Sequence, residues 1–369
     1  MALSKIQTNS ITDGNITTAK IADTAVHGYR NLIRNGACTI SQRGSTFSNA
    51  SHNVNTIDGF TSNWSLGGWT ITQDSNAPNG FSKSFKIVPD SAATPTGSDY
   101  AVIDLRIEAQ DLHRLDYGTS NAQTLVLSFW VKSNVTGQYA MNAFASDGDA
   151  GGARQRNSAY TINSSDVWEY KTIIIPGDTD ALAAINDDNG EGFRITFFLC
   201  VGTTYSGGTT DTWANWVYAN FGAAQQANVK SSTSNYWQIT GVQLEVGSEA
   251  TPFEHRPYGD ELARCQRYYY ELGGQNYYPY SLARAISSTL ARPIFQHPVP
   301  MRASPAISAI NLSSIIIEGV PLTNLNIDIM TPLNAMLNAY VSSGLTAGDC
   351  VRLFDTGTGV SKIQFKAEL

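Results

Sequence analysis

The histidines are the side chains best suited to acid–base catalysis, and their spacing does not favour it. His27, His52, His113, His255 and His297 are far apart in the sequence. The chain contains no HExxH, no GxSxG and no glycine-rich phosphate loop. His255 stands between Glu254 and Arg256, which favours a hydrogen-bonding role between domains or subunits. The sequence therefore predicts that the chain is not an enzyme.

Paired carboxylates are the other catalytic possibility, because glycoside cleavage needs two of them across one sugar bond. The candidates lie in two short acidic segments, SDGDAGG and NDDNGEG: Asp147, Asp149, Asp187, Asp188 and Glu191. Segments of this composition are typical of solvated turns. Their oxygens could also ligate calcium, which prefers carboxylates and carbonyls. A structural calcium ion is therefore an alternative, and no other cofactor is expected.

Aromatic side chains offer a binding chemistry instead. A flat ring packs against the apolar face of a pyranose, while nearby polar groups bond its hydroxyls. The first candidates lie in the aromatic-rich, poorly periodic stretch from Thr203 to Lys230. The second candidates are two tryptophans that flank a Gly-Gly turn. The predicted glycan contacts are Tyr205, Trp213 and Trp216, followed by Trp64 and Trp69. Core packing or subunit packing is the alternative for all five.

Two further aromatic groups receive different predictions. Trp130 and Trp237 lie in strand-like sequence and are expected in the core or between sheets. The cluster Tyr277-Tyr278-Pro279-Tyr280 is expected at a tip surface or at a seam between subunits.

Composition narrows the classes of partner. Only 15% of the 369 residues are charged and the net charge is -7, which argues against nucleic acid. No apolar run reaches membrane-spanning length, so membrane insertion is not expected. The first residues, MALSK, do not resemble a secretory signal. Four scattered cysteines, Cys38, Cys200, Cys265 and Cys350, are predicted to be buried free thiols in a chain that folds in a reducing cytosol.

The elements that must position the aromatics are short strands. In TLVLSFWVK and GFRITFFLCVG every second residue is apolar and lines one face, and Asn-Gly, Asp-Gly and Gly-Gly turns separate many such runs. This pattern predicts an all-β chain. We expect an antiparallel jelly-roll β-sandwich over residues 28–258 and a smaller C-terminal β domain over 259–369.

Residues 236–272 join these two bodies. Trp237 and Ile239 share one strand face while Val242, Leu244 and Val246 share the other, so a β-bulge is predicted at Gly241. A proline-bearing connector follows, and then a short helix capped by Asp260. Beyond it, only TPLNAMLNAYV suggests helix.

Residues 1–27 carry one apolar residue every five positions: Ile6, Ile11, Ile16, Ile21 and Val26. Because this spacing fits neither a helix nor a strand face, the segment could bury these residues only against copies of itself or a partner. We expect a self-associating or docking stalk, with a disordered tail as the alternative.

These motifs together resemble the distal part of a bacteriophage tail fibre or related virion appendage with a jelly-roll, carbohydrate-binding-module-like domain. The residues that carry the resemblance are NLIRNGACTISQRG, TIDGF, LSFWVKSNVTGQY, the QLEVGSEATPFEHRPYGDELARCQRYYYE block, PMRASPAIS and FKAEL. The repeat ITDGNITTAKIADTAV is similar to the connecting stalk of such fibres.

The resemblance implies a homotrimer on the phage tail or particle surface, made in the bacterial cytoplasm. Its N-terminus would contact other virion proteins, and exposed aromatic loops would bind host polysaccharide or lipopolysaccharide. Subunits are expected to touch at Glu254, His255 and Arg256. A polysaccharide depolymerase and a purely structural decoration of the capsid or tail are the alternatives.

Overall fold

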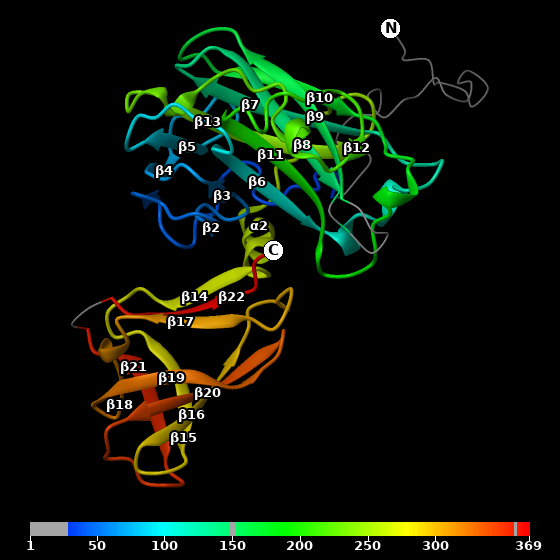
Figure 1. The fold of residues 1–369 in the computed structure, drawn as a ribbon. Helices are drawn as coiled ribbons and strands as arrows, with labels where there is room; N and C mark the ends of the chain where they lie inside the picture. The colour runs from blue at the N-terminus through cyan, green and yellow to red at the C-terminus, as the bar shows by residue number, and fades with distance from the viewer. Residues whose placement is uncertain (1–28, 146, 148–152, 358–359) are drawn as a thin grey trace, which may run out of the picture.

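The protein consists of two β-rich bodies joined by one helix (Figure 1). This computed structural model describes residues 29–145, 147, 153–357 and 360–369. The predicted stalk residues Ile6, Ile11, Ile16, Ile21 and Val26 lie outside the described residues. We call the larger body, with strands β1 to β13, the sandwich, and the smaller one, with β14 to β22, the C-terminal body.

The sandwich is built from two antiparallel sheets, with strand orders β1-β4-β5-β13-β7-β10 and β12-β9-β8-β11-β6-β3-β2. Its strands are β1 Thr46–Phe47, β2 Val54–Asn55, β3 Thr61–Trp64, β4 Trp69–Asp74, β5 Ser84–Pro89, β6 Tyr100–Glu108, β7 Leu125–Ser133, β8 Gly137–Ala145, β9 Arg154–Ile162, β10 Glu169–Ile175, β11 Glu191–Val201, β12 Ala214–Asn215 and β13 Trp237–Val246. Its short helices are α1 Tyr218–Phe221, η3 Ala109–Asp111, η4 His113–Leu115, η6 Ala181–Ala183 and η7 Val229–Ser231.

The connectivity of the sandwich is that of the predicted jelly roll. Four strands in the order β5-β13-β7-β10 belong to one sheet, and four in the order β6-β11-β8-β9 belong to the other. From β5 to β8 each successive strand lies in the other sheet, and the same holds from β9 to β11. Strands that are distant in sequence therefore become neighbours within a sheet. This is the double-sheet arrangement of a jelly roll.

The core between the sheets is filled by the inward side of the alternating runs. Phe197 packs 5.0 Å from Phe129 and 5.8 Å from Trp237, measured between ring centroids. Trp237 is fully buried, as predicted. Trp130 was expected inside as well, but it is half-buried and packs against Tyr170 on the outer face of its sheet. Its even position in β7 places it opposite Leu127, Phe129 and Val131.

The predicted bulge in β13 is confirmed. The register between β13 and β7 shifts between Thr240 and Gln243, and Gly241 has a φ of +64°. A Cβ atom at Gly241 would lie 2.6 Å from the ring of Phe81, so the position also requires a residue without a side chain.

The connecting helix α2 spans Tyr258–Gln266 and begins earlier than predicted. Pro257 is the N-cap residue, and Asp260 lies in the first turn instead of capping it. An acidic side chain in the first turn still interacts favourably with the positive end of the helix dipole.

The C-terminal body contains a three-stranded sheet, β14-β22-β17, and a closed barrel, β15-β16-β20-β19-β18-β21. Its elements are β14 Tyr269–Gly273, β15 Pro279–Ala285, β16 Leu290–Gln296, β17 Ala306–Ile310, η8 Leu312–Ser314, β18 Ile315–Ile317, β19 Val320–Met330, β20 Asn334–Val341, β21 Cys350–Asp355 and β22 Lys362–Lys366. The helix suggested by TPLNAMLNAYV is therefore wrong, because most of that segment forms β20.

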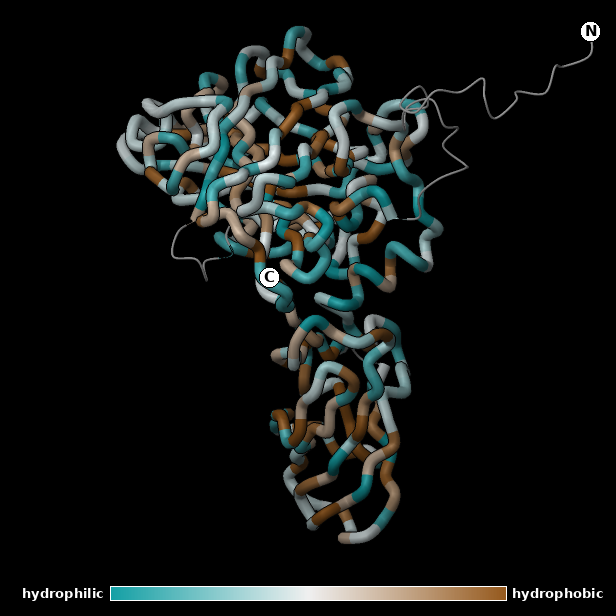
Figure 2. The backbone as a smooth tube through the Cα atoms, turned by 90° about the vertical axis from the view of Figure 1, so that its right-hand side faces the viewer, coloured by the Kyte–Doolittle hydropathy of each residue, from teal (hydrophilic) through white to brown (hydrophobic). Residues whose placement is uncertain are grey.

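In side view, the C-terminal body is a narrow extension beneath the broader sandwich (Figure 2). Three cysteines, Cys38, Cys200 and Cys265, are buried free thiols as predicted, whereas Cys350 is exposed. Burial raises the pKa of the Cys38 thiol to about 12. Within the described ranges, no helix has the length and apolar character needed to cross a membrane.

Candidate functional site

The outer face of the seven-stranded sheet carries a row of polar side chains. The register places Asp104 of β6 beside Thr196 of β11, Thr196 beside Asn142 of β8, and Asn142 beside Asn157 of β9. The sequence neighbours of Asp104, Thr196 and Asn142 belong to the core, so these three side chains point away from it, and Asn157 is paired with Asn142 on the same face. Thr196 donates a 2.7 Å hydrogen bond to Asp104.

The segment between β11 and β13 folds back over part of this face. Amide side chains of β9 hold its backbone: Gln155 donates to the carbonyl of Val217 at 2.8 Å, and Asn157 donates to that of Phe221 at 2.8 Å. The main-chain N–H of Trp216 also donates to Ala153 O at 2.9 Å. The aromatic segment is thus fixed to the sheet by specific bonds.

The result is a continuous group of rings that we call the aromatic ridge. Trp216 lies between Phe144 of β8, at 5.3 Å, and Phe221 of α1, at 5.1 Å. Tyr218 lies 6.0 Å from Trp216 and 6.0 Å from Tyr205. The ridge comprises Tyr100, Phe144, Tyr205, Trp216, Tyr218 and Phe221.

Exposure differs along the ridge. Phe221 packs 4.8 Å from Phe198 of the sheet, which anchors the cluster. Tyr218 is 61% exposed, while Tyr205 and Trp216 are half-buried. Rings that are fixed on one side and open on the other suit stacking against a flat ligand.

The hydroxyl of Tyr100 adds a polar group to the ridge. Burial, with Tyr205 and Asp104 nearby, raises the pKa of Tyr100 above its ordinary value. The phenol therefore stays neutral at ordinary pH, and it donates a 2.9 Å hydrogen bond to Asn63.

A cluster of four charges lies next to the ridge on the same face. Arg106 and Arg194 both contact Asp104, at 3.5 and 3.7 Å, and both contact Glu191, at 3.2 Å each. The guanidinium carbon of Arg194 also lies 4.6 Å from the ring centroid of Phe144. Each carboxylate is thus paired with two guanidinium groups, so both acids have a structural role in this cluster.

The three residues predicted as the main glycan contacts are not all brought together. Tyr205 and Trp216 belong to the ridge, but Trp213, directly before β12, contacts other residues. Its ring packs 5.9 Å from Tyr117 and 6.4 Å from Phe193, and its indole N–H donates to Pro176 O at 2.6 Å. Trp213 therefore anchors the segment against the core.

The second pair of predicted contacts is buried. Trp64 is 4% exposed and Trp69 is 0% exposed, and both belong to the sandwich core. The indole N–H of Trp69 donates to Leu66 O at 2.7 Å, and the Lys230 ammonium lies 4.6 Å from its ring centroid. A ring without an accessible face cannot stack on a sugar, so Trp64 and Trp69 are core residues, which corrects their assignment as glycan contacts.

The predicted interface residues of the connector make bonds within this chain. Glu254 accepts hydrogen bonds from the main-chain N–H groups of Tyr29 and Asn31, at 2.8 and 2.9 Å. Arg256 is paired with Glu254 at 3.0 Å and with Glu261 of α2 at 3.3 Å. His255 is exposed and packs against Phe81 and Phe253. Contact of these residues with another subunit stays a prediction.

The acidic turns considered for calcium have separate contacts. Asp147 accepts from Asn186 N at 2.6 Å, Asp187 is 2.7 Å from His113, and Asp188 accepts from Gly190 N at 2.6 Å. Glu191 belongs to the charge cluster described above, and Asp149 lies outside the described residues. In the described part of the chain, no three His, Cys, Asp or Glu side chains are grouped so that they could hold a metal ion.

Sequence reasoning missed several ridge residues. Tyr218 and Phe221 lie in the aromatic-rich stretch but were not selected, because α1 has no visible periodicity. Phe144 could have been found, since it alternates with Met141 and Ala143 in β8 and must point outward.

Comparisons with known proteins found similar solved structures that cover somewhat more than half of the chain. No family model and no curated protein matches the chain. Among solved structures, the enzymatically active domain of tailspike protein 4 of bacteriophage CBA120 is 16% identical, with a TM-score of 0.31, and the match covers 57% of this chain and 22% of that chain. A CBM4 structure is 14% identical, with a TM-score of 0.30, covering 58% of this chain and 99% of that chain.

A third similar structure is the family 11 carbohydrate-binding module of Clostridium thermocellum in complex with a β-1,3-1,4-mixed-linked tetrasaccharide. It is 12% identical, with a TM-score of 0.29, and the match covers 56% of this chain and 98% of that chain. At this degree of similarity, the function of the present chain has to be argued from its own residues.

Proposed function

We propose that this chain is a structural and host-recognition component of a phage virion, of the tail-fibre type, and that it binds cell-surface glycan through the aromatic ridge. The observation that carries the proposal is a set of rings, with Tyr218 61% exposed, fixed by side-chain amides to a rigid sheet. Host polysaccharide or lipopolysaccharide is the proposed partner.

The chemistry of binding follows from the surroundings of the ridge. The faces of Trp216 and Tyr218 would contact the C–H face of a pyranose. Its hydroxyls would bond to polar groups of the same segment. Asp211, with 63% of its side chain exposed, and the exposed Asn215 offer such groups. Because the sheet holds the ridge in place, little ordering entropy is lost on binding.

We propose that the site binds glycan without cleaving it. A glycosidase needs one protonated and one free carboxyl group across the scissile bond. Three acids lie near the ridge. Asp104 and Glu191 are both engaged by Arg106 and Arg194, and Asp211 lies 3.5 Å from Arg156. Release of reducing ends from a bound polysaccharide would contradict this proposal and favour a depolymerase.

Glycan binding at the ridge is tested with Trp216→Ala and Tyr218→Ala. We expect each variant to weaken binding of the chain to immobilised lipopolysaccharides and capsular polysaccharides at least about fivefold. Quenching of tryptophan fluorescence by the glycan gives a second readout. All 7 tryptophans lie between residues 64 and 237, so the signal comes from the sandwich, which carries the ridge.

The matched control for the ridge is Tyr170→Ala. Tyr170 is 45% exposed and lies on the outer face of the other sheet, so its loss should leave binding unchanged. Equal binding by the wild type and both ridge variants would place the glycan site elsewhere or leave the chain a purely structural decoration.

We further propose that the chain acts as a homotrimer on the virion, with residues 1–27 contacting other virion proteins. Linked copies would compensate for weak binding at each single site, because the second and third contacts occur at high effective concentration. Mass measurement in solution at micromolar concentration should give three times the 39.9 kDa chain mass. A stable monomer would contradict the trimer.

A further inference from the structure

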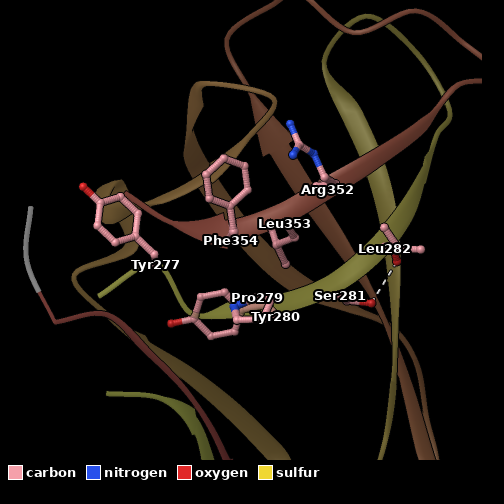
Figure 3. A pocket seen from close by; sticks show the side chains of 8 residues that line it. All are labelled: Tyr277, Pro279, Tyr280, Ser281, Leu282, Arg352, Leu353 and Phe354. Carbon is pink, nitrogen blue, oxygen red and sulfur yellow. Dashed lines mark hydrogen bonds between the residues drawn. The ribbon is translucent and has the colours of Figure 1, made fainter. Parts of the chain in front are cut away.

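The C-terminal body contains a cavity of about 460 Å³ beside the barrel strands β15 and β21. Tyr277, Pro279 and Leu282 line it from β15 and the turn before it, and Arg352 and Phe354 line it from β21. Figure 3 shows Phe354 and Arg352 projecting from the same side of β21, with Tyr277 near one end. The volume falls within the range of small-molecule sites, about 300–1,000 Å³.

The ring of Tyr277 is exposed and yet held in place. Its backbone is left-handed, with a φ of +59°, and the residue is 70% exposed. The ring lies directly against Gly357, where a Cβ atom would come within 2.5 Å of it. The buried Asp355 fixes this turn by accepting hydrogen bonds from Gly357 N at 2.7 Å and Tyr277 N at 3.4 Å.

The charge of Arg352 is already balanced. Glu318 accepts from Nε and Nη2 of Arg352 at 3.1 and 3.0 Å, and from its main-chain N–H at 2.8 Å. The guanidinium carbon lies 5.5 Å from the ring centroid of Phe354. An anionic ligand would meet the Glu318 carboxylate, so the cavity favours an uncharged one.

We propose that this cavity is a second saccharide site, which binds a neutral pyranose unit between Tyr277 and Phe354. Aromatic walls suit the apolar face of the sugar, and the guanidinium of Arg352 can donate to its hydroxyls. The proposal extends the glycan-binding function proposed above. It concerns different residues on a different body, so the two sites can fail separately.

The test uses saturation-transfer NMR on the full chain with three neutral trisaccharides: β-1,4-galactotriose, cellotriose and maltotriose. Trigalacturonate, an α-1,4-linked trimer of galacturonate, is the anionic probe. Because the rings contact C–H groups that these sugars share, we expect weak binding of all three neutral probes in the Trp216→Ala background, which removes the ridge contribution. Adding Tyr277→Ala should weaken that binding at least about fivefold.

The control for Tyr277→Ala is Leu333→Ala. Leu333 is 52% exposed on the same body and does not line the cavity, so its loss should change nothing. Glu318→Gln gives an independent check without removing a cavity wall. It leaves Arg352 unbalanced, so trigalacturonate should gain affinity while the neutral probes do not.

The proposal would be overturned by no signal from any neutral probe, by equal binding after Tyr277→Ala, or by tighter wild-type binding of trigalacturonate than of galactotriose. A lower solution mass of the Tyr277→Ala variant would also overturn it, because the cavity would then be an interface between copies. Loss of polysaccharide binding through Trp216→Ala alone, with the trisaccharide signals intact, would leave this site standing.

Discussion

At the scale of single residues, Glu108 is the group on which the join between the two bodies depends most. It lies at the end of β6, is fully buried, and accepts hydrogen bonds from Arg267 Nε and Nη2 at 2.8 and 2.7 Å. Tyr268 also donates to it. Burial raises the pKa of Glu108, but the donors Arg267 and Tyr268 outweigh burial and hold that pKa below its ordinary value.

Replacement of this carboxylate should therefore have an effect that depends on pH. We expect Glu108→Gln to lower the free energy of unfolding by about 1–3 kcal/mol near pH 7, a range that allows for the partly exposed Arg267. Because the folded pKa is depressed, the stabilisation is present above the unfolded pKa of about 4.3 and is lost as pH falls through the folded pKa.

The measurement is urea unfolding of the wild type and the variant between pH 3 and pH 7. The difference between them should shrink below about pH 4. Glu318→Gln is the control, since its pair with Arg352 is exposed and screened by solvent, so its loss should change stability much less than loss of the Glu108 carboxylate. A difference that stays constant over the whole pH range would show that the charge of Glu108 does not stabilise the junction.

At the scale of elements, β13 shows how one residue shapes a strand. The bulge at Gly241 lets Trp237 and Ile239 face the core before it, and Val242 and Leu244 face the core after it. Gly36 packs closely against the strand at this bulge, since a Cβ atom there would lie 2.0 Å from the carbonyl oxygen of Val242. The strand can complete the sheet only if both positions lack side chains.

Gly241→Ala should destabilise the sandwich by about 2–4 kcal/mol, from left-handed backbone strain together with the clash against Phe81. Thermal unfolding followed by tryptophan fluorescence measures the loss. Gly67→Ala is the matched control, because a Cβ atom there would meet nothing within 4 Å. Similar losses for both variants would contradict a specific role of the bulge.

The elements also show what the sequence could and could not predict. Apolar residues at every second position predicted β7 and β11, because burial of one strand face imposes a period of two, and a switch of that face at Gly241 predicted the bulge. In β20, Ala335, Leu337 and Ala339 alternate in the same way, but their high helix propensity suggested a helix, and pairing within the barrel overrides that propensity. The site was harder, because whether Trp64, Trp213 or Trp216 faces the core depends on strand register, which composition does not reveal.

At the scale of the whole molecule, the two bodies are held together by more than α2. Arg302 of the C-terminal body donates to Asn189 O at 2.6 Å, and Asn189 donates back to Arg302 O at 2.6 Å. Arg43 of the sandwich pairs with Glu368. These contacts fix how the cavity of one body is presented relative to the ridge of the other.

Loss of Arg302 should therefore loosen the arrangement of the bodies without unfolding either. We expect Arg302→Ala to separate one calorimetric unfolding transition into two and to broaden the distance distribution in small-angle X-ray scattering. Arg284→Ala is the control, since Arg284 is exposed on the barrel, away from the junction. An unchanged single transition in Arg302→Ala would mean that Glu108 and α2 hold the bodies together without it.

The order of the three-stranded sheet has a consequence for how the protein is made. β22 is the last strand in chain order, yet it is the middle strand between β14 and β17. During synthesis the two flanking strands leave the ribosome first and have no partner between them until Lys362–Lys366 emerges. The sandwich can complete its core while translation is still under way, but the C-terminal body must wait, with its strand edges exposed to any other nascent chain nearby.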